Sequence, residues 1–186
     1  MEFPQINDAL GDIGAFGIAV IAAIIGLVAH WVTWALLNRA SGLTESGADE
    51  VLLRHTRNVA RVLFVIGAVL LSTFLMSEEG QEIVRFLGIF LGIIALGWLL
   101  VAFIGAGYEI ALMRFPQDGE DDLEERQLKT QLQILQRFGS AIIWIVAIAI
   151  ALLTIPGVQP LAASMLAGAG VAGIVLGLAA GPTIGN

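Results

Sequence analysis

The chain has 186 residues, of which 58% are hydrophobic and only 13% are charged, and its formal net charge at pH 7 is −7. A soluble domain of this length needs more polar surface than that to cover its core, so the composition excludes the ordinary soluble globular class. The chain contains no cysteine, which excludes disulfide frameworks and thiolate metal sites.

Apolar stretches of membrane-spanning length follow one another along the chain, since about 20 residues of helix cross a hydrocarbon core of about 30 Å. We expect spans over residues 13–37, 59–76, 86–108, 138–155 and 158–186. They predict an all-α membrane protein of about five transmembrane helices. Its parts are a three-helix region over 1–114, a polar amphipathic linker over 115–137 and a two-helix core over 138–186.

The first two spans carry polar or aromatic residues near one end. Trp31 and Trp34 stand near the end of the first span, where tryptophan is typical of the membrane interface. Arg61 interrupts the second span close enough to its end for the guanidinium to reach the interface along its aliphatic stem.

The basic residues predict the orientation. Eight of the nine lie in or beside the first and third connections, namely Arg39, Arg54, Arg57, Arg61, Arg114, Arg126, Lys129 and Arg137. Only Arg85 falls on the other side. Lys and Arg gather in cytoplasmic loops, so we expect the N-terminus outside and the C-terminus in the cytoplasm.

The polar stretch over 121–138 has helical periodicity. Leu128, Leu132 and Leu135 recur at helical spacing, after a run of acids. This pattern is typical of an amphipathic helix lying at the inner interface, and equally of a solvated helical linker.

The residues that could carry catalysis do not form a recognisable constellation. His30 ends the first span, His55 is expected in a loop, and Glu109 is expected to be a hydrated acid at the cytoplasmic boundary. None has partners at metal-ligand spacing, so we expect no enzyme, no metal and no cofactor. The GxGxxG pattern over 168–173 lies inside an apolar stretch without a preceding strand, which excludes a dinucleotide site.

Glycines form a stripe on the last predicted helix. Gly173, Gly177 and Gly181 are spaced four apart, and Gly170 lies one turn earlier on the same side. Small residues let membrane helices approach closely. The stripe therefore indicates either a tight helix pair within one subunit or a ring of identical helices around an axis.

A helical wheel at about 100° per residue places an apolar face beside the glycines. Ile174 and Leu178 lie on that face, one turn apart, and Val171 and Val175 lie beyond them. In a ring, the glycines and valines would form the two flanks. Stacked rings of Ile174 and Leu178 would then form a narrow apolar constriction, which can block ions by dewetting.

The segment over 164–186, SMLAGAGVAGIVLGLAAGPTIGN, resembles the pore helix of the small-conductance mechanosensitive channel family over 23 residues. The stretch over 129–155 resembles the family's preceding helix. The resemblance implies a homoheptamer in the cell membrane, a prokaryotic plasma membrane, that opens under membrane tension. Such a channel contacts lipids, releases ions and small osmolytes in osmotic downshock, and has no nucleic-acid partner.

The resemblance also implies roles for individual residues. Ile174 and Leu178 match the hydrophobic gate, and Gly181 and Pro182 fall where the family's helix kinks. Pore-helix packing is assigned to a further four positions, Ala167, Gly170, Gly173 and Gly177. Val171 and Val175 depart from the family pattern, because they are bulkier than the alanines expected on that flank.

The family's pore continues past Asn186 into a cytoplasmic domain, so the resemblance implies either a fragment of a longer protein or a shortened member. Two other functions fit the sequence. One is a small secondary transporter, although such proteins place ionisable groups near the midplane and few are present. The other is a structural membrane subunit that dimerises through its glycine-rich helix.

Overall fold

A computed structural model describes residues 3–41, 47–76, 78–113 and 123–184. Within these ranges the chain forms five α-helices and one short 3-10 turn, without any strand. The helices are α1 (Phe3–Ser41), α2 (Gly47–Ser72), α3 (Glu78–Met113), α4 (Leu123–Leu153) and α5 (Gln159–Ile184). The 3-10 turn η1 (Thr73–Leu75) follows α2 directly. The expected all-α membrane architecture is confirmed.

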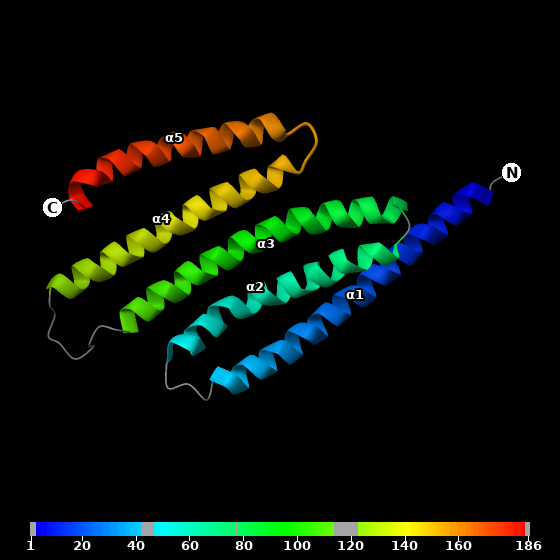
Figure 1. Ribbon diagram of the computed structural model, residues 1–186, viewed down its shortest axis with the longest axis horizontal. Coiled ribbons are helices and arrows are strands. Elements are labelled where there is room, and N and C mark those ends of the chain that lie inside the picture. Colours follow the sequence, from blue (N-terminus) through cyan, green and yellow to red (C-terminus); the bar gives the residue numbers. More distant parts are fainter. Residues whose placement is uncertain (1–2, 42–46, 77, 114–122, 185–186) are drawn as a thin grey trace.

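The helices pack in chain order as antiparallel neighbours (Figure 1). The α1–α2 and α3–α4 connections lie at one end of the bundle, together with the C-terminal end of α5. The α2–α3 and α4–α5 connections lie at the other end. We call the end with the α1–α2 connection the basic end.

Four helical segments are long and apolar enough to cross a membrane, over Gly14–Ala40, Gly47–Leu75, Gly80–Met113 and Gln127–Leu153. Each is longer than the sequence predicts, because polar residues continue the helix beyond the apolar core. In α5 the apolar segment among the described residues is shorter, Gln159–Val175. A fifth membrane crossing therefore stays a prediction.

The expected interfacial segment and the fourth span form one helix. α4 begins at Leu123 and runs without interruption to Leu153. The polar segment over 123–137 therefore continues the fourth span as part of the same helix. It does not form a separate helix lying flat at the interface. The acidic part of the linker before Leu123 lies outside the described residues.

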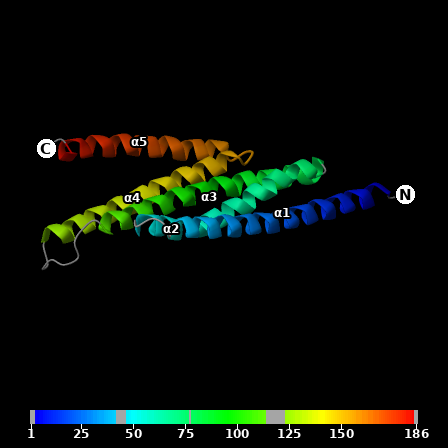
Figure 2. The ribbon, with the colours of Figure 1, turned by 60° about the horizontal axis from the view of Figure 1, so that its bottom comes forward.

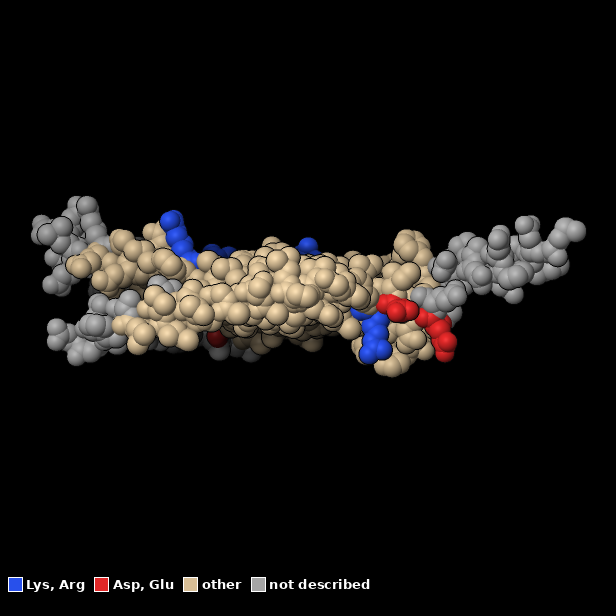
Figure 3. Space-filling model, turned by 90° about the horizontal axis from the view of Figure 1, so that it is seen from above, with Lys and Arg blue, Asp and Glu red and all other residues tan. Residues whose placement is uncertain are grey.

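The interior of the bundle is built from small side chains. Nine of the twelve buried apolar residues in the described part of the chain are alanines, while the large aliphatic side chains are on the outside. A soluble protein has the opposite arrangement. Lipid tails solvate leucine as well as a protein core does, so close backbone contact between helices becomes the main source of packing energy. Figure 3 shows an outer face whose charged side chains lie mostly toward the ends of the bundle.

Glycines of α1 and α3 provide the closest helix contacts. A Cβ on Gly26 would lie 2.7 Å from the carbonyl oxygen of Phe64 in α2, and one on Gly97 would lie 2.5 Å from the Cβ of Ala147 in α4. Such distances leave no room for a methyl group. These glycines therefore set the separations between α1 and α2 and between α3 and α4.

Polar side chains at helix ends bond back to the helix. The buried hydroxyls of Ser72 and Thr73 donate to the carbonyl oxygens of Val69 and Leu70 at 2.7 Å. At the same end of the bundle, Gly157 adopts φ +84° between α4 and α5. This left-handed conformation favours glycine and reverses the chain direction.

We expect Gly26→Ala to lower the free energy of unfolding by about 1–3 kcal/mol, because the added methyl group meets the backbone of α2. Thermal unfolding in detergent would measure the change. Gly17→Ala is the matched control in the same helix, since a Cβ there meets nothing within 4 Å. Equal effects of the two substitutions would contradict the proposed α1–α2 contact.

Candidate pore helix and the polar cluster at the basic end

Helix α5 is attached to the bundle along one side and mainly near its beginning. Ala162 is fully buried, and Met165, Leu166 and Ala169 are half-buried at helical spacing on the same side. Helix α4 is the principal neighbour of α5. The two helices diverge toward the C-terminal end of α5 in both ribbon views (Figures 1 and 2).

The two residues matched to the gate lie on the side of α5 that faces away from α4. Ile174 is 66% exposed and Leu178 is 75% exposed. Val171, Val175 and Ala167 are exposed on the same half of the helix. The side chains that the sequence assigns to an axis-facing surface are therefore uncovered in the single chain.

The stripe glycines of α5 differ from the glycines of the bundle. A Cβ at Gly170, Gly173 or Gly177 would meet nothing within 4 Å. The structure thus argues against one interpretation of the stripe, a tight helix pair within one subunit. Gly181 and Pro182 lie in the last turns of α5, but their surroundings, like the position of Asn186, lie outside the described residues.

The GxGxxG pattern lies within the continuous helix α5, with no strand before it in the described ranges. A dinucleotide-binding loop needs a strand-to-helix turn whose backbone amides face a pyrophosphate. Helical hydrogen bonding occupies most of those amides here, which agrees with the exclusion of such a site.

A polar cluster joins α2 and α3 at the basic end, and sequence analysis missed it. Arg54 of α2 forms an ion pair with Glu109 of α3 through its Nη2. The neighbouring His55 lies in α2, so the expectation of a loop there is wrong. Its Nδ1 donates to the Val51 carbonyl oxygen at 3.1 Å, and its Nε2 lies 3.6 Å from Glu109 Oε2.

Gly105 makes space for this cluster. A Cβ at Gly105 would lie 3.1 Å from Cδ2 of His55 and 3.8 Å from Nε2 of Gln136 in α4. Side chains of α2 and α4 therefore approach the backbone of α3 at one level of the bundle. The contacts orient the helices, but within the described residues no group of three or more His, Cys, Asp or Glu side chains is arranged to hold a metal ion.

A second contact at the basic end joins α1 to α2. His30 is buried, and its Nε2 donates to the backbone carbonyl oxygen of Arg57 at 3.2 Å. The ring of His30 stacks on Trp34 with centroids 5.3 Å apart. Trp34 is only 7% exposed, whereas Trp31 is 71% exposed, so of the two tryptophans only Trp31 is free to face lipid.

Comparison of this chain with protein-family models, with curated proteins and with solved structures found no match.

The Arg54–Glu109 pair predicts non-additive effects. We expect Arg54→Gln to have a much smaller effect on thermal stability when Glu109 is already Gln, because the ion pair is then absent. Unfolding midpoints of both single variants and the double variant, in detergent, would measure this coupling. Arg39→Gln, in the last turn of α1, combined with Glu109→Gln is the control and should be additive. Additivity in both pairs would show that the ion pair does not link α2 to α3.

Proposed function

We propose that the chain forms a channel opened by membrane tension, in which α5 from several identical subunits lines the pore. The observation that supports this proposal best is the uncovered apolar and glycine surface of α5. The resemblance of residues 164–186 to a family of mechanosensitive pore helices suggests the same function.

The glycines of α5 need an explanation other than packing within the chain. Glycine inside a helix costs about 0.5–1 kcal/mol relative to alanine, because it loses more backbone freedom on folding. In α1 and α3 this cost is offset by close helix contacts, as at Gly26 and Gly97. At Gly170, Gly173 and Gly177 of α5 no such contact exists with the described residues, so we infer that a neighbouring subunit provides it.

A ring of α5 helices would use the three surfaces of this helix together. The side with Ala162 and Met165 rests on α4 and connects the helix to its own bundle. The glycines and valines would contact the two adjacent subunits, and Ile174 and Leu178 would face the axis. In a sufficiently narrow ring, these apolar side chains would exclude water and block ions.

Membrane tension would act through the area that each conformation occupies. Tension favours the state with the larger cross-section in the membrane plane, so it shifts a two-state equilibrium toward an expanded ring. The bundle α1–α4 presents its large apolar side chains outward, where lipid would transmit that tension. Ions and small osmolytes would leave the cell through the expanded pore, a function that needs no cofactor.

Leu178→Ser tests the gate. We expect a channel that conducts at low tension, because a hydroxyl lets water enter the constriction. Patch-clamp recording from membranes containing the variant would show this leak. Leu161→Ser, also an exposed leucine of α5 but near its attached end, is the control and should close normally. Normal closure of the Leu178 variant would contradict its assignment to the gate.

Gly173→Val tests assembly separately from folding. We expect the variant subunit to keep the stability of the parent subunit, because a Cβ at Gly173 meets no atom of its own chain. The oligomer should weaken, since the valine would separate adjacent α5 helices. Mass measurement in detergent is the readout.

The parent protein should contain about seven copies if the resemblance to the channel family extends to assembly. One to three copies in the parent would favour the transporter or the dimerising subunit instead. Gly97→Val is the matched control: it should destabilise the subunit itself, because a Cβ there already meets Ala147.

A further inference from the structure

We propose that a cleft between α1 and α2 at the basic end binds the phosphate headgroup of an anionic phospholipid. The cleft has a volume of about 380 Å³. It is lined by one buried indole, three amide or acidic side chains, one leucine and two arginines: Trp34, Asn38, Asn58, Glu50, Leu53, Arg54 and Arg57. The proposal does not depend on the channel function.

Three arginines form a row along α2 beside this cleft. Arg54, Arg57 and Arg61 are three and four positions apart, so they share one face of the helix and extend over about 10 Å. All three are exposed. Arg54 is engaged by Glu109, whereas neither Arg57 nor Arg61 forms an ion pair with any residue in the described ranges.

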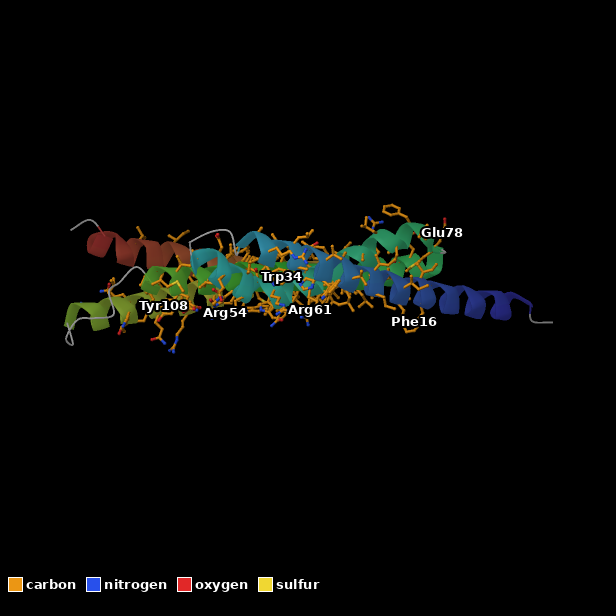
Figure 4. The ribbon with its side chains drawn as sticks, turned by 90° about the horizontal axis from the view of Figure 1, so that it is seen from below. Phe16, Trp34, Arg54, Arg61, Glu78 and Tyr108 are labelled. Carbon is orange, nitrogen blue, oxygen red and sulfur yellow. The ribbon has the colours of Figure 1, made fainter. Side chains whose placement is uncertain are left out.

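The neighbouring aromatic residues indicate the depth of the row. The hydrogen bond from His30 to the Arg57 carbonyl oxygen puts these two residues at one level, and Trp34 stacks on His30. The adjacent Trp31 is exposed, and tryptophan side chains that face lipid concentrate at the membrane–water interface. Figure 4 shows Arg54, Trp34 and Arg61 in succession along the bundle, with Glu78 toward the other end. Arg57 therefore lies at headgroup level, and Arg61 lies one turn deeper.

A charge at the depth of Arg61 needs a counter-charge. Burying an arginine in hydrocarbon costs several kcal/mol unless water or an anion accompanies it. Glu50 is the acid among the cleft-lining residues. It lies two helical turns before Arg57, near the start of α2 and therefore farther from the apolar part of that helix. A phosphate oxygen from the bilayer can reach Arg57 and Arg61 directly. Arginine also matches phosphate with paired hydrogen bonds.

The same geometry favours a lipid over soluble phosphate. Toward the middle of the bundle the row leads to an apolar outer surface that includes Leu27 of α1 and Val62 of α2, both exposed. A phospholipid places its phosphate at the arginines while its acyl chains cover this surface. Inorganic phosphate would have to leave water for the edge of the hydrocarbon without that compensation.

The experiment compares lipid binding to the purified full chain by native mass spectrometry in detergent. Phosphatidylglycerol should bind the parent more tightly than phosphatidylcholine. In the variant Arg57→Gln/Arg61→Gln, we expect affinity for phosphatidylglycerol to fall about 30-fold, since each arginine near an anionic lipid contributes a roughly constant increment. Arg85→Gln, at the opposite end of the bundle, should leave affinity unchanged. Undiminished binding in the double variant would overturn the proposal.

Three further measurements test the need for positive charge, the source of the phosphate and the folding of the variants. Arg57→Lys/Arg61→Lys keeps both charges and should retain most of the preference for phosphatidylglycerol, whereas a loss equal to that of the glutamine variant would overturn the phosphate assignment. Thermal stabilisation by inorganic phosphate at the same concentration would overturn the lipid assignment. Thermal unfolding without added lipid compares the folding of all variants.

Discussion

Close approach between helices is the constraint on which the rest of this structure depends. In a bilayer the outside of the protein is as apolar as any core, so leucine and isoleucine gain little by turning inward. Backbone groups must also be bonded within each segment, which leaves the helix as the suitable spanning element. Alanines and a few glycines consequently occupy the interior, and contacts such as Gly97 against Ala147 hold the bundle together.

The helical glycines of this chain fall into two kinds, those that contact a neighbouring helix and those that do not. Gly26 and Gly97 are in contact with a neighbouring helix of the same chain, whereas a Cβ at Gly170 or Gly177 would meet no atom within 4 Å. Their sequence contexts are alike, since both kinds stand in apolar helices. The division follows from the attachment of α5, which rests on α4 near its beginning and then leaves it (Figure 1). Close glycine contacts within the chain are therefore found in α1 and α3, and not at these two glycines of α5.

Hydropathy predicted the helical class, because length and apolar composition alone decide whether a segment can span a bilayer. It made the helices too short, since polar turns such as the one containing His55, before the predicted start of the second span, are also helical. The Arg54–Glu109 pair was missed because the partners are 55 positions apart and meet only after α2 packs on α3. The helical wheel placed Ile174 and Leu178, the residues proposed as a gate, on one face of the last helix, but a wheel predicts the side that residues share and not the partner that they face.

Because α5 is attached to the bundle mainly near its beginning, a small tilt there moves its far end by a much larger distance. Its 26 residues extend about 39 Å, and its attached end adjoins the reversal at Gly157. A change of about 5° in inclination at that end displaces the far end by about 3 Å, comparable to the width of a water molecule. The long rod α4 ends at the same reversal, so a slight rotation of one helix becomes a displacement of molecular size at the tip of the next.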